Sequence, residues 1–272
     1  LFSNEYDRNI LLTSFKNIIM EGIFSIENKV IIITGGGKGI GYHLAKNMAK
    51  RCAYVYAVDI EFSKIDENVD KFLFQEKCNI TNYKKFEKIC DKIFKKHKKI
   101  DVLINCAGVS FSEQKQNTFY PIEKWLDTIN VNFTAAFNCS QAVIRHMIKN
   151  STGSIINMTS IVAEQGFPRN PAYNASKGGL KMLGKALAKD WGRSGIRVNN
   201  LGPGFIKTNI TKGRYDNKKS RKVRAERTLL GRWGEKDDLI GPCVFLASDA
   251  SKFMTGQDLY VDGGWLANSG IE

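Results

Sequence analysis

The most informative segment of this 272-residue chain is Thr34-Gly35-Gly36-Gly37-Lys38-Gly39-Ile40-Gly41. It follows a β-branched apolar run, Val30–Thr34, and precedes a helix-like run that extends to Lys50. Glycines at a strand–helix junction let the backbone turn tightly and approach a pyrophosphate, while the helix N-terminus offers unpaired N–H groups to the anion. We therefore predict a dinucleotide-binding turn. Its expected contacts are Gly35, Lys38, Gly39, Ile40 and Gly41.

An acidic residue, Asp59, ends the second predicted strand, Tyr54–Val58. A carboxylate at this place can accept hydrogen bonds from both hydroxyls of the adenosine ribose and would repel a 2′-phosphate. The opposing signal is Lys38, which could bind that phosphate. We give the aspartate more weight, because its repulsion is direct whereas a lysine is flexible and solvated. The predicted cofactor is NAD rather than NADP.

Apolar strand-like runs alternate with helical ones along the rest of the chain. Further strands are expected from Phe72–Phe74 onward and at Val102–Asn105, Ser154–Met158, Arg197–Leu201 and Leu259–Val261. Helices are expected at Tyr83–Lys98, Pro121–Lys149 and Tyr173–Trp191. This alternation predicts an α/β fold, a single-domain Rossmann-type doubly wound parallel sheet. Residues 1–28 are interpreted as an N-terminal arm of unknown role, and residues 29–272 as the dinucleotide-binding domain.

The composition indicates an ordinary globular protein, with 43% hydrophobic and 25% charged residues. No apolar run approaches the roughly 20 residues of a membrane-spanning helix, so no membrane association is expected. The six cysteines have no metal-ligand spacing, which indicates free thiols in a reducing compartment and no metal site. We therefore expect a cytoplasmic protein.

Tyr173 and Lys177 are four residues apart in a predicted helix, so both side chains lie on one face. A nearby ammonium favours the phenolate and lowers the pKa of a tyrosine, which suits it to proton transfer. Such pairs also occur on solvated helices. Ser160 lies 13 residues upstream, at the end of a predicted strand.

Several motifs in order resemble the short-chain dehydrogenase/reductase family over residues 28–265. The glycine spacing Thr-Gly-x-x-x-Gly-x-Gly is its cofactor signature, and Asn105-Cys106-Ala107-Gly108 resembles its Asn-x-Ala-Gly element. Pro203-Gly204, four residues before Thr208, resembles the segment that closes over the nicotinamide, and Val261-Asp262-Gly263-Gly264 resembles its final strand. The family pattern implies an NAD(P)-dependent oxidoreductase that transfers a hydride between nicotinamide and a secondary alcohol or ketone.

The resemblance assigns catalytic roles to four residues. Tyr173 is the acid/base, Ser160 stabilises the charge on the substrate oxygen, and Lys177 reaches the nicotinamide ribose. Asn132 matches the asparagine that holds a relay water, although a satisfied buried amide is the alternative. Asn79 stands where the family usually has an aspartate for the adenine amino group, and its amide oxygen could accept the same bond. The implied cofactor contacts also include Ile80, Asn105, Ala107, Gly108, Tyr173, Lys177, Pro203, Gly204, Ile206 and Thr208. The family usually forms dimers and tetramers through two long helices, here about 121–149 and 173–191.

Positive charge is concentrated in one segment. The net charge is +14, and residues 207–232 hold ten Lys/Arg against Asp216 and Glu226, a net +8. We expect residues of about 205–232 to form a substrate lid, and loop 164–171 is the other candidate for substrate contacts. The lid would bind an anionic substrate through Arg214, Arg221 or Arg224, unless the cluster is a solvated surface in a Lys-rich protein.

The substrate remains open between several classes. Residues 256–265 resemble the ending of gluconate dehydrogenase-like members, which favours a sugar acid, polyol or sugar derivative. A 3-oxoacyl-acyl-carrier-protein reductase fits the core almost equally well. A nucleic-acid-binding protein on a dehydrogenase scaffold is the alternative of another class, and the complete set of catalytic residues argues against it.

Overall fold

The computed structural model describes residues 22–62, 71–112 and 119–270. These residues form a seven-stranded sheet in the order β3-β2-β1-β4-β5-β6-β7, with every neighbouring pair parallel. The predicted doubly wound α/β fold is therefore confirmed. The order reverses at β1, which lies between β2 and β4. Ligands of such sheets bind outside the carboxyl ends of the strands at this point of reversal.

The strands lie close to the predicted runs. They are β1 (Val30–Thr34), β2 (Tyr54–Asp59), β3 (Leu73–Lys77), β4 (Val102–Asn105), β5 (Gly153–Met158), β6 (Ile196–Pro203) and β7 (Asp258–Val261). The main helices are α2 (Gly39–Ala49), α3 (Tyr83–His97), α4 (Ile122–Ile129), α5 (Ala135–Asn150), α6 (Pro171–Trp191), α7 (Lys212–Asp216), α8 (Lys218–Arg227) and α9 (Ile240–Ala247).

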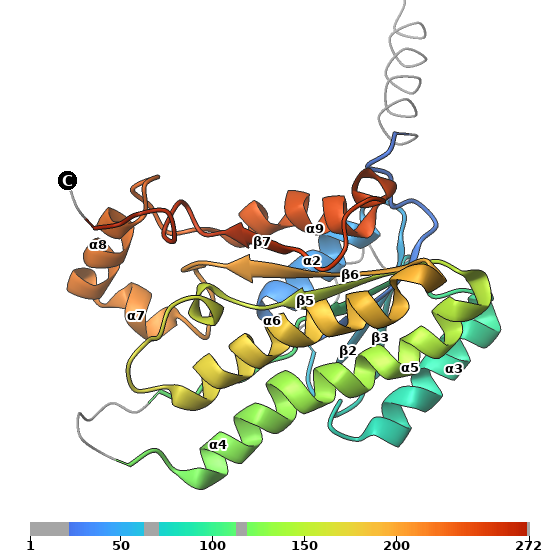
Figure 1. Ribbon diagram of the computed structural model, residues 1–272, viewed down its shortest axis with the longest axis horizontal. Coiled ribbons are helices and arrows are strands. Elements are labelled where there is room, and N and C mark those ends of the chain that lie inside the picture. Colours follow the sequence, from blue (N-terminus) through green and yellow to red (C-terminus); the bar gives the residue numbers. More distant parts are fainter. Residues whose placement is uncertain (1–21, 63–70, 113–118, 271–272) are drawn as a thin grey trace, which may run out of the picture.

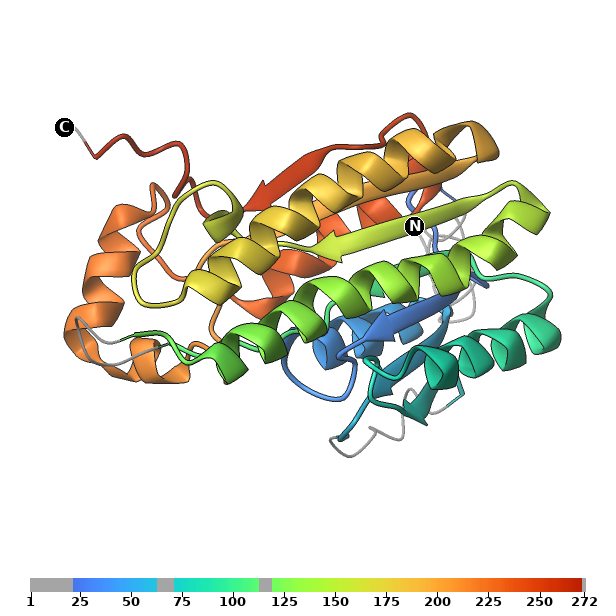
Figure 2. The ribbon, with the colours of Figure 1, turned by 60° about the horizontal axis from the view of Figure 1, so that its bottom comes forward.

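Helices cover both faces of the sheet, which explains why β1, β4 and β5 are buried along their whole length. On one face, α2 and α9 pack their apolar side chains against the sheet, for example Leu44 and Val244. On the other face, α3, α5 and α6 do so, for example through Phe86 and Leu187. Figures 1 and 2 show these two layers on either side of the strands.

The long helix predicted at Pro121–Lys149 is interrupted. A π-helical segment, Asn130–Thr134, separates α4 from α5. A π segment inserts one extra residue into a turn, and such segments are frequent at functional sites. It places Asn132 at a buried position, 1% exposed, from which its side chain reaches the segment after β4. Hydrophobic periodicity could not predict this interruption, because one extra residue barely disturbs the pattern.

The basic segment forms a short cap at one end of the sheet. Helices α7 and α8 lie beyond the carboxyl ends of β6 and β7, toward which the arrows point in Figure 1. Of the expected N-terminal arm, residues 1–21 lie outside the described residues. In residues 22–28, Ile26 is buried in the core and the ring of Phe24 lies 6.3 Å from that of Phe245 on α9. No described helix is long and apolar enough to cross a bilayer.

Candidate active site

The glycine turn is built from close backbone contacts. A Cβ on Gly37 would lie 1.8 Å from the backbone oxygen of Glu61, and one on Gly41 would lie 2.1 Å from the oxygen of Gly35. Gly35 has a φ of +68°, and its Cβ would lie 2.7 Å from Cα of Ala107. These positions therefore exclude larger side chains. In front of the α2 N-terminus, by contrast, a Cβ on Gly39 would meet nothing within 4 Å.

The hydroxyl of Thr34 fixes the turn to the next strand of the sheet. It accepts hydrogen bonds from the N–H groups of Cys106 (3.2 Å) and Ala107 (3.3 Å), just after β4. The turn and the Asn-Cys-Ala-Gly element thus form one crevice at the point where the strand order reverses. Open space before a helix N-terminus, bounded by glycine backbone, fits the pyrophosphate of a dinucleotide.

Asp59 ends β2 beside this turn. Its carboxylate accepts hydrogen bonds from the N–H groups of Gly37 (2.9 Å) and Ile60 (2.7 Å). The ammonium of Lys38 pairs with Glu61 at 3.0 Å, and this pairing raises the pKa of Lys38. Glu61 therefore competes with any anion for the one lysine of the turn.

Ser160, Tyr173 and Lys177 come together from β5 and α6. Asn170 caps α6 by accepting a hydrogen bond from the N–H of Tyr173, which sets the start of the helix. The side chain of Ser160, just after β5, hydrogen-bonds to Tyr173. The buried ammonium of Lys177 donates to the carbonyl of Met158 at 2.7 Å and lies 5.6 Å from the centre of the Tyr173 ring. The predicted shared face is therefore present.

The pKa of Tyr173 is shifted in the direction opposite to the one predicted from the sequence. Burial raises the pKa of Tyr173 above 10, against a lowering contribution from the Ser160 hydrogen bond. Burial also lowers the pKa of Lys177 to about 8. The expected lowering by Lys177 does not dominate, because desolvation acts on both groups and the ammonium is bonded to Met158 rather than to the phenol. The guanidinium of Arg214 is the positive charge that lowers the pKa of Tyr173.

Asn132 has a fully satisfied side chain. Its oxygen accepts from the N–H of Val109 (2.8 Å), and its amide donates to the carbonyl of Val109 (2.9 Å) and the hydroxyl of Ser176 (3.1 Å). Ser176 in turn donates to the carbonyl of Tyr173. The amide thus ties the segment after Gly108 to the first turn of α6. This is the satisfied buried amide that was the alternative for Asn132, and the relay role stays a prediction.

The remaining predicted contacts lie at the carboxyl edge of the sheet, but several side chains point elsewhere. Ile80 and Ile206 are buried in the core, and the amide of Asn105 donates inside the sheet to Asn157. The oxygen of Asn79 accepts from both the N–H and the hydroxyl of Thr81. Any cofactor contact of Ile80, Ile206 or Asn105 would therefore have to involve the backbone of that residue. The side-chain bond predicted for Asn79 would have to compete with Thr81.

The segment after β6 completes this edge. Gly204 follows Pro203 and packs against β7, so that a Cβ would lie 2.7 Å from Cα of Asp262. The N–H of Thr208 donates to the hydroxyl of Thr211 at 2.9 Å, which forms a compact turn before α7. Ala107 and Gly108 lie opposite, with the Cβ position of Gly108 3.8 Å from the ammonium of Lys177.

A cavity of about 160 Å³ lies against Ser160 and Tyr173. Its other walls come from Phe167–Asn170, from Phe205 and from the start of the basic segment, including Arg214 and Arg224. The loop and the lid expected from the sequence thus both reach it. Ser110 and Ser112 also line the cavity, and sequence reasoning missed them because no motif marks them. Ile210, a further wall residue, lies within the predicted lid.

Comparisons with known proteins agree with this geometry. The family described as "Enoyl-(Acyl carrier protein) reductase" matches residues 35–266. The chain is 38% identical over 256 residues to the 5-keto-D-gluconate 5-reductase of Escherichia coli, covering 91% of this chain and 99% of that protein. The chain belongs to the short-chain dehydrogenase/reductase family. The predicted family is therefore confirmed.

Other relatives also match most of this chain. A 3-oxoacyl-acyl-carrier-protein reductase of Thermotoga maritima is 35% identical over 253 residues, 88% of this chain and 98% of its own. The crystal structure of a gluconate 5-dehydrogenase from Burkholderia cenocepacia, in complex with NADP and tartrate, has a TM-score of 0.81 at 32% identity and covers 90% of this chain and 97% of its own.

Family membership settles the reaction class. The protein is an oxidoreductase that transfers a hydride between a nicotinamide cofactor and a hydroxyl or carbonyl carbon, as predicted.

The six cysteines are unpaired. Within the described ranges, no group of three His, Cys, Asp or Glu residues is placed to hold a metal ion.

Proposed function

We propose that this protein interconverts a sugar acid and its keto form at a secondary carbon, with Tyr173 as the acid/base. The observation that carries the proposal is the cavity in which Ser160 and Tyr173 face Arg214 and Arg224. A polyhydroxylated anion has an alcohol that can react at Ser160 and Tyr173. It also has a negative charge that the two arginines can bind. The named activities of the gluconate relatives support the same substrate class.

The residues divide the work as follows. The bound cofactor supplies or accepts the hydride. The Tyr173 phenol donates a proton to the carbonyl oxygen, and the phenolate removes it in the opposite direction. Ser160 hydrogen-bonds the same oxygen and stabilises its developing charge. Lys177 holds positive charge next to the tyrosine and would contact the nicotinamide ribose, and the turn at 34–41 would bind the pyrophosphate.

The proposed cofactor is NAD. Asp59 presents a carboxylate where the adenosine ribose would lie, and Lys38 is already paired with Glu61. A 2′-phosphate would therefore meet a negative charge without a free lysine in the turn. Solved relatives that contain NADP support the competing choice. Comparing kcat/KM for NAD and NADP decides between them.

A second candidate is reduction of a 3-oxoacyl group on a carrier protein. The Thermotoga relative and the description of the matching family favour it, and a basic lid would suit an acidic carrier. A nucleic-acid partner has no such support. The open cavity beside the site favours a small anion over a long acyl chain, because its described walls carry more basic side chains (Lys124, Arg169, Arg214 and Arg224) than large apolar ones (Phe111 and Ile210).

We also propose a cytoplasmic homo-oligomer, a dimer or tetramer. Apolar side chains are exposed along α4 and α5, including Ile122, Leu126 and Phe137. Burying such a surface between copies would be favourable. Light scattering of the purified protein gives the number of copies directly.

The test of the proposed function is a substrate panel. Purified enzyme is assayed for NAD reduction and NADH consumption with sugar acids, neutral polyols and 3-oxoacyl thioesters. We expect the highest kcat/KM with a sugar acid. A higher kcat/KM with a 3-oxoacyl thioester would favour the second candidate. Turnover of neutral polyols alone would show that the substrate need not be an anion.

A further inference from the structure

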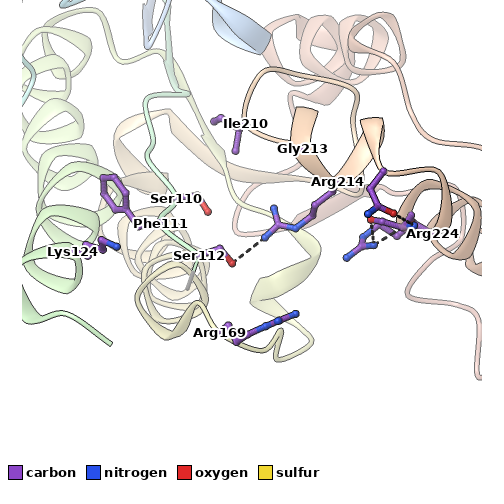
Figure 3. Close-up of a pocket in the computed structure, with 11 residues that line it drawn as sticks. Ser110, Phe111, Ser112, Lys124, Arg169, Ile210, Gly213, Arg214 and Arg224 are labelled. Atoms are coloured by element: carbon purple, nitrogen blue, oxygen red, sulfur yellow. Dashed lines mark hydrogen bonds between the residues drawn. The ribbon is translucent and has the colours of Figure 1, made fainter. Parts of the chain in front are cut away.

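A second, larger cavity continues outward from the catalytic one. It has a volume of about 730 Å³ and lies between the segment after β4, α7 and α8 (Figure 3). The two cavities form one continuous space, because they share six described wall residues: Ser110, Ser112, Arg169, Ile210, Arg214 and Arg224. A substrate held at Tyr173 can therefore extend into the outer space.

The described wall residues of this space carry positive charge only. Arg214, Arg224 and Arg169 line both cavities, and Lys124 lines the outer one. No aspartate or glutamate is among the described wall residues of either cavity. Figure 3 shows Arg169 coming from a different segment than Arg214 and Arg224. The positive charges of Arg214 and Arg224 repel each other, and a bound anion would relieve that repulsion.

Arg214 and Arg224 are held in place by neutral groups. Arg214 donates to the hydroxyl of Ser112 at 3.1 Å, across the cavity from its own helix. Arg224 donates to the carbonyl of Ser220 at 3.1 Å and lies over the ring of Phe205, with 5.0 Å to the ring centre. Neither forms an ion pair with a described carboxylate. Burial, and then the charge of Arg214, lower the pKa of Arg224.

The buried Nε of Arg224 has no hydrogen-bond partner among the described residues. An unpaired buried donor on a charged group is costly. A substrate oxyanion beside the guanidinium would supply acceptor oxygens to both arginines, and arginine donors suit carboxylate and phosphate geometry.

The volumes of the inner and outer cavities indicate where the charged group of the substrate would lie. A cavity of about 150 Å³ holds a ligand the size of benzene, so the inner space of about 160 Å³ accommodates only the reacting part of a sugar acid. The charged end must extend toward the outer space. Arg214 and Arg224 line the passage between the two.

We propose that Arg214 and Arg224 form an anion subsite that binds the carboxylate or phosphate of the substrate and thereby sets which carbon faces Tyr173. This inference rests on the proposed function and names the residues that would recognise the anion. Arg169 adds positive charge from another wall. The ligand chemistry is an oxyanion on a polyhydroxylated chain.

The same basic segment supplies a matched control. Arg221 precedes Arg224 by three residues on α8, yet it lines neither cavity. Its guanidinium lies over the ring of Tyr215, 5.3 Å from the centre, in an outer depression with Lys218 and Lys222. Arg221→Gln removes the same charge as Arg224→Gln without changing the walls of the cavity.

The experiment compares D-gluconate with D-glucitol, in which CH₂OH replaces the carboxylate, using NAD and the variants Arg214→Gln, Arg224→Gln and Arg221→Gln. The measured quantity is the ratio of kcat/KM for gluconate to that for glucitol. We expect the first two variants to lower this ratio about 10- to 100-fold, the range of a charge-assisted hydrogen bond. Arg221→Gln should change it less than about twofold.

Further arms separate the outcomes. An added arm with 6-phospho-D-gluconate identifies phosphate as the bound anion if its kcat/KM shows the larger loss. Titration of D-gluconate into the enzyme–NADH complex measures binding at the subsite without turnover. If gluconate binds in a way that depends on both arginines but is not oxidised with NAD, the subsite is upheld while the proposed function fails. Equal losses for gluconate and glucitol, or an equal loss in Arg221→Gln, would overturn the proposal.

Discussion

The two halves of the active site are constructed differently. At the ends of β1 and β2, the turn at 34–41 is determined by backbone contacts that leave no room for a Cβ. Around Ser160 and Tyr173, buried side chains carry the chemistry, and their charges depend on neighbours far apart in the sequence. Cofactor binding and proton transfer therefore depend on different parts of the site, and variants in each half should affect one and spare the other.

The largest expected effect is on the side-chain half. Tyr173→Phe removes the proton donor and leaves the turn untouched. We expect kcat to fall about 10²–10⁴-fold, the usual contribution of general acid–base catalysis, while the Kd for NADH stays within about twofold. Steady-state kinetics and fluorescence titration measure the two quantities. A loss below tenfold would remove Tyr173 from the acid/base role.

Lys177 lies at the border of the two halves, and burial destabilises its charged form. Its pKa is about 8 in the folded protein against 10.5 for an ordinary lysine. Between these values the unfolded chain binds more protons, so the free energy of unfolding rises with pH across this window. Lys177→Met should therefore stabilise the cofactor-free protein most below pH 8, by roughly 3 kcal/mol at most, and progressively less toward pH 10.5.

Urea unfolding of wild type and Lys177→Met at several pH values measures this difference. The variant should also lose activity and NADH affinity together, unlike Tyr173→Phe. A stability difference that is constant from pH 7 to pH 10 would show that the ammonium is not desolvated.

On the backbone half, Gly37→Ala should act through binding. The new Cβ would lie 1.8 Å from the oxygen of Glu61, so the turn must shift. We expect a loss of about 1–3 kcal/mol in stability, as for other overpacked sites, together with a weaker Kd for NADH. The matched control is Gly241→Ala on α9, where a Cβ meets nothing within 4 Å. Thermal unfolding that is equal in the two variants would contradict the geometry of the turn.

The smallest expected effect concerns the choice of cofactor. Asp59→Asn keeps the shape of the side chain and an acceptor for the N–H of Gly37, but it removes the negative charge. The ratio of kcat/KM for NAD to that for NADP should fall about tenfold, equivalent to about 1.4 kcal/mol. An unchanged ratio would place the discrimination elsewhere, with Lys38 as the next residue to vary.

The sequence was sufficient for features that depend on the backbone. Apolar strands alternating with helices predicted the sheet, and the glycine spacing predicted the turn, because only glycine satisfies the contacts at Gly37 and Gly41. The i, i+4 spacing correctly placed Tyr173 and Lys177 on one face. Each of these follows from a local rule.

Features that depend on side-chain direction and desolvation could not be predicted. The basic segment divides into Arg214 and Arg224 at the cavity and Arg221 outside it, which composition alone does not reveal. The pKa of Tyr173 is raised rather than lowered, because burial outweighs its neighbours. The oxygen of Asn79 is engaged by Thr81, a local turn that the family pattern did not suggest.

The most direct test of the central claim follows the hydride itself. Wild-type enzyme is incubated with NAD and D-gluconate deuterated at every carbon-bound hydrogen, and the products are analysed by mass spectrometry. We predict NADH that carries one deuterium, together with a keto acid that has lost deuterium at a single secondary carbon, and no such transfer on the same time scale with Tyr173→Phe. Wild-type enzyme that forms no deuterated NADH from gluconate would contradict the account.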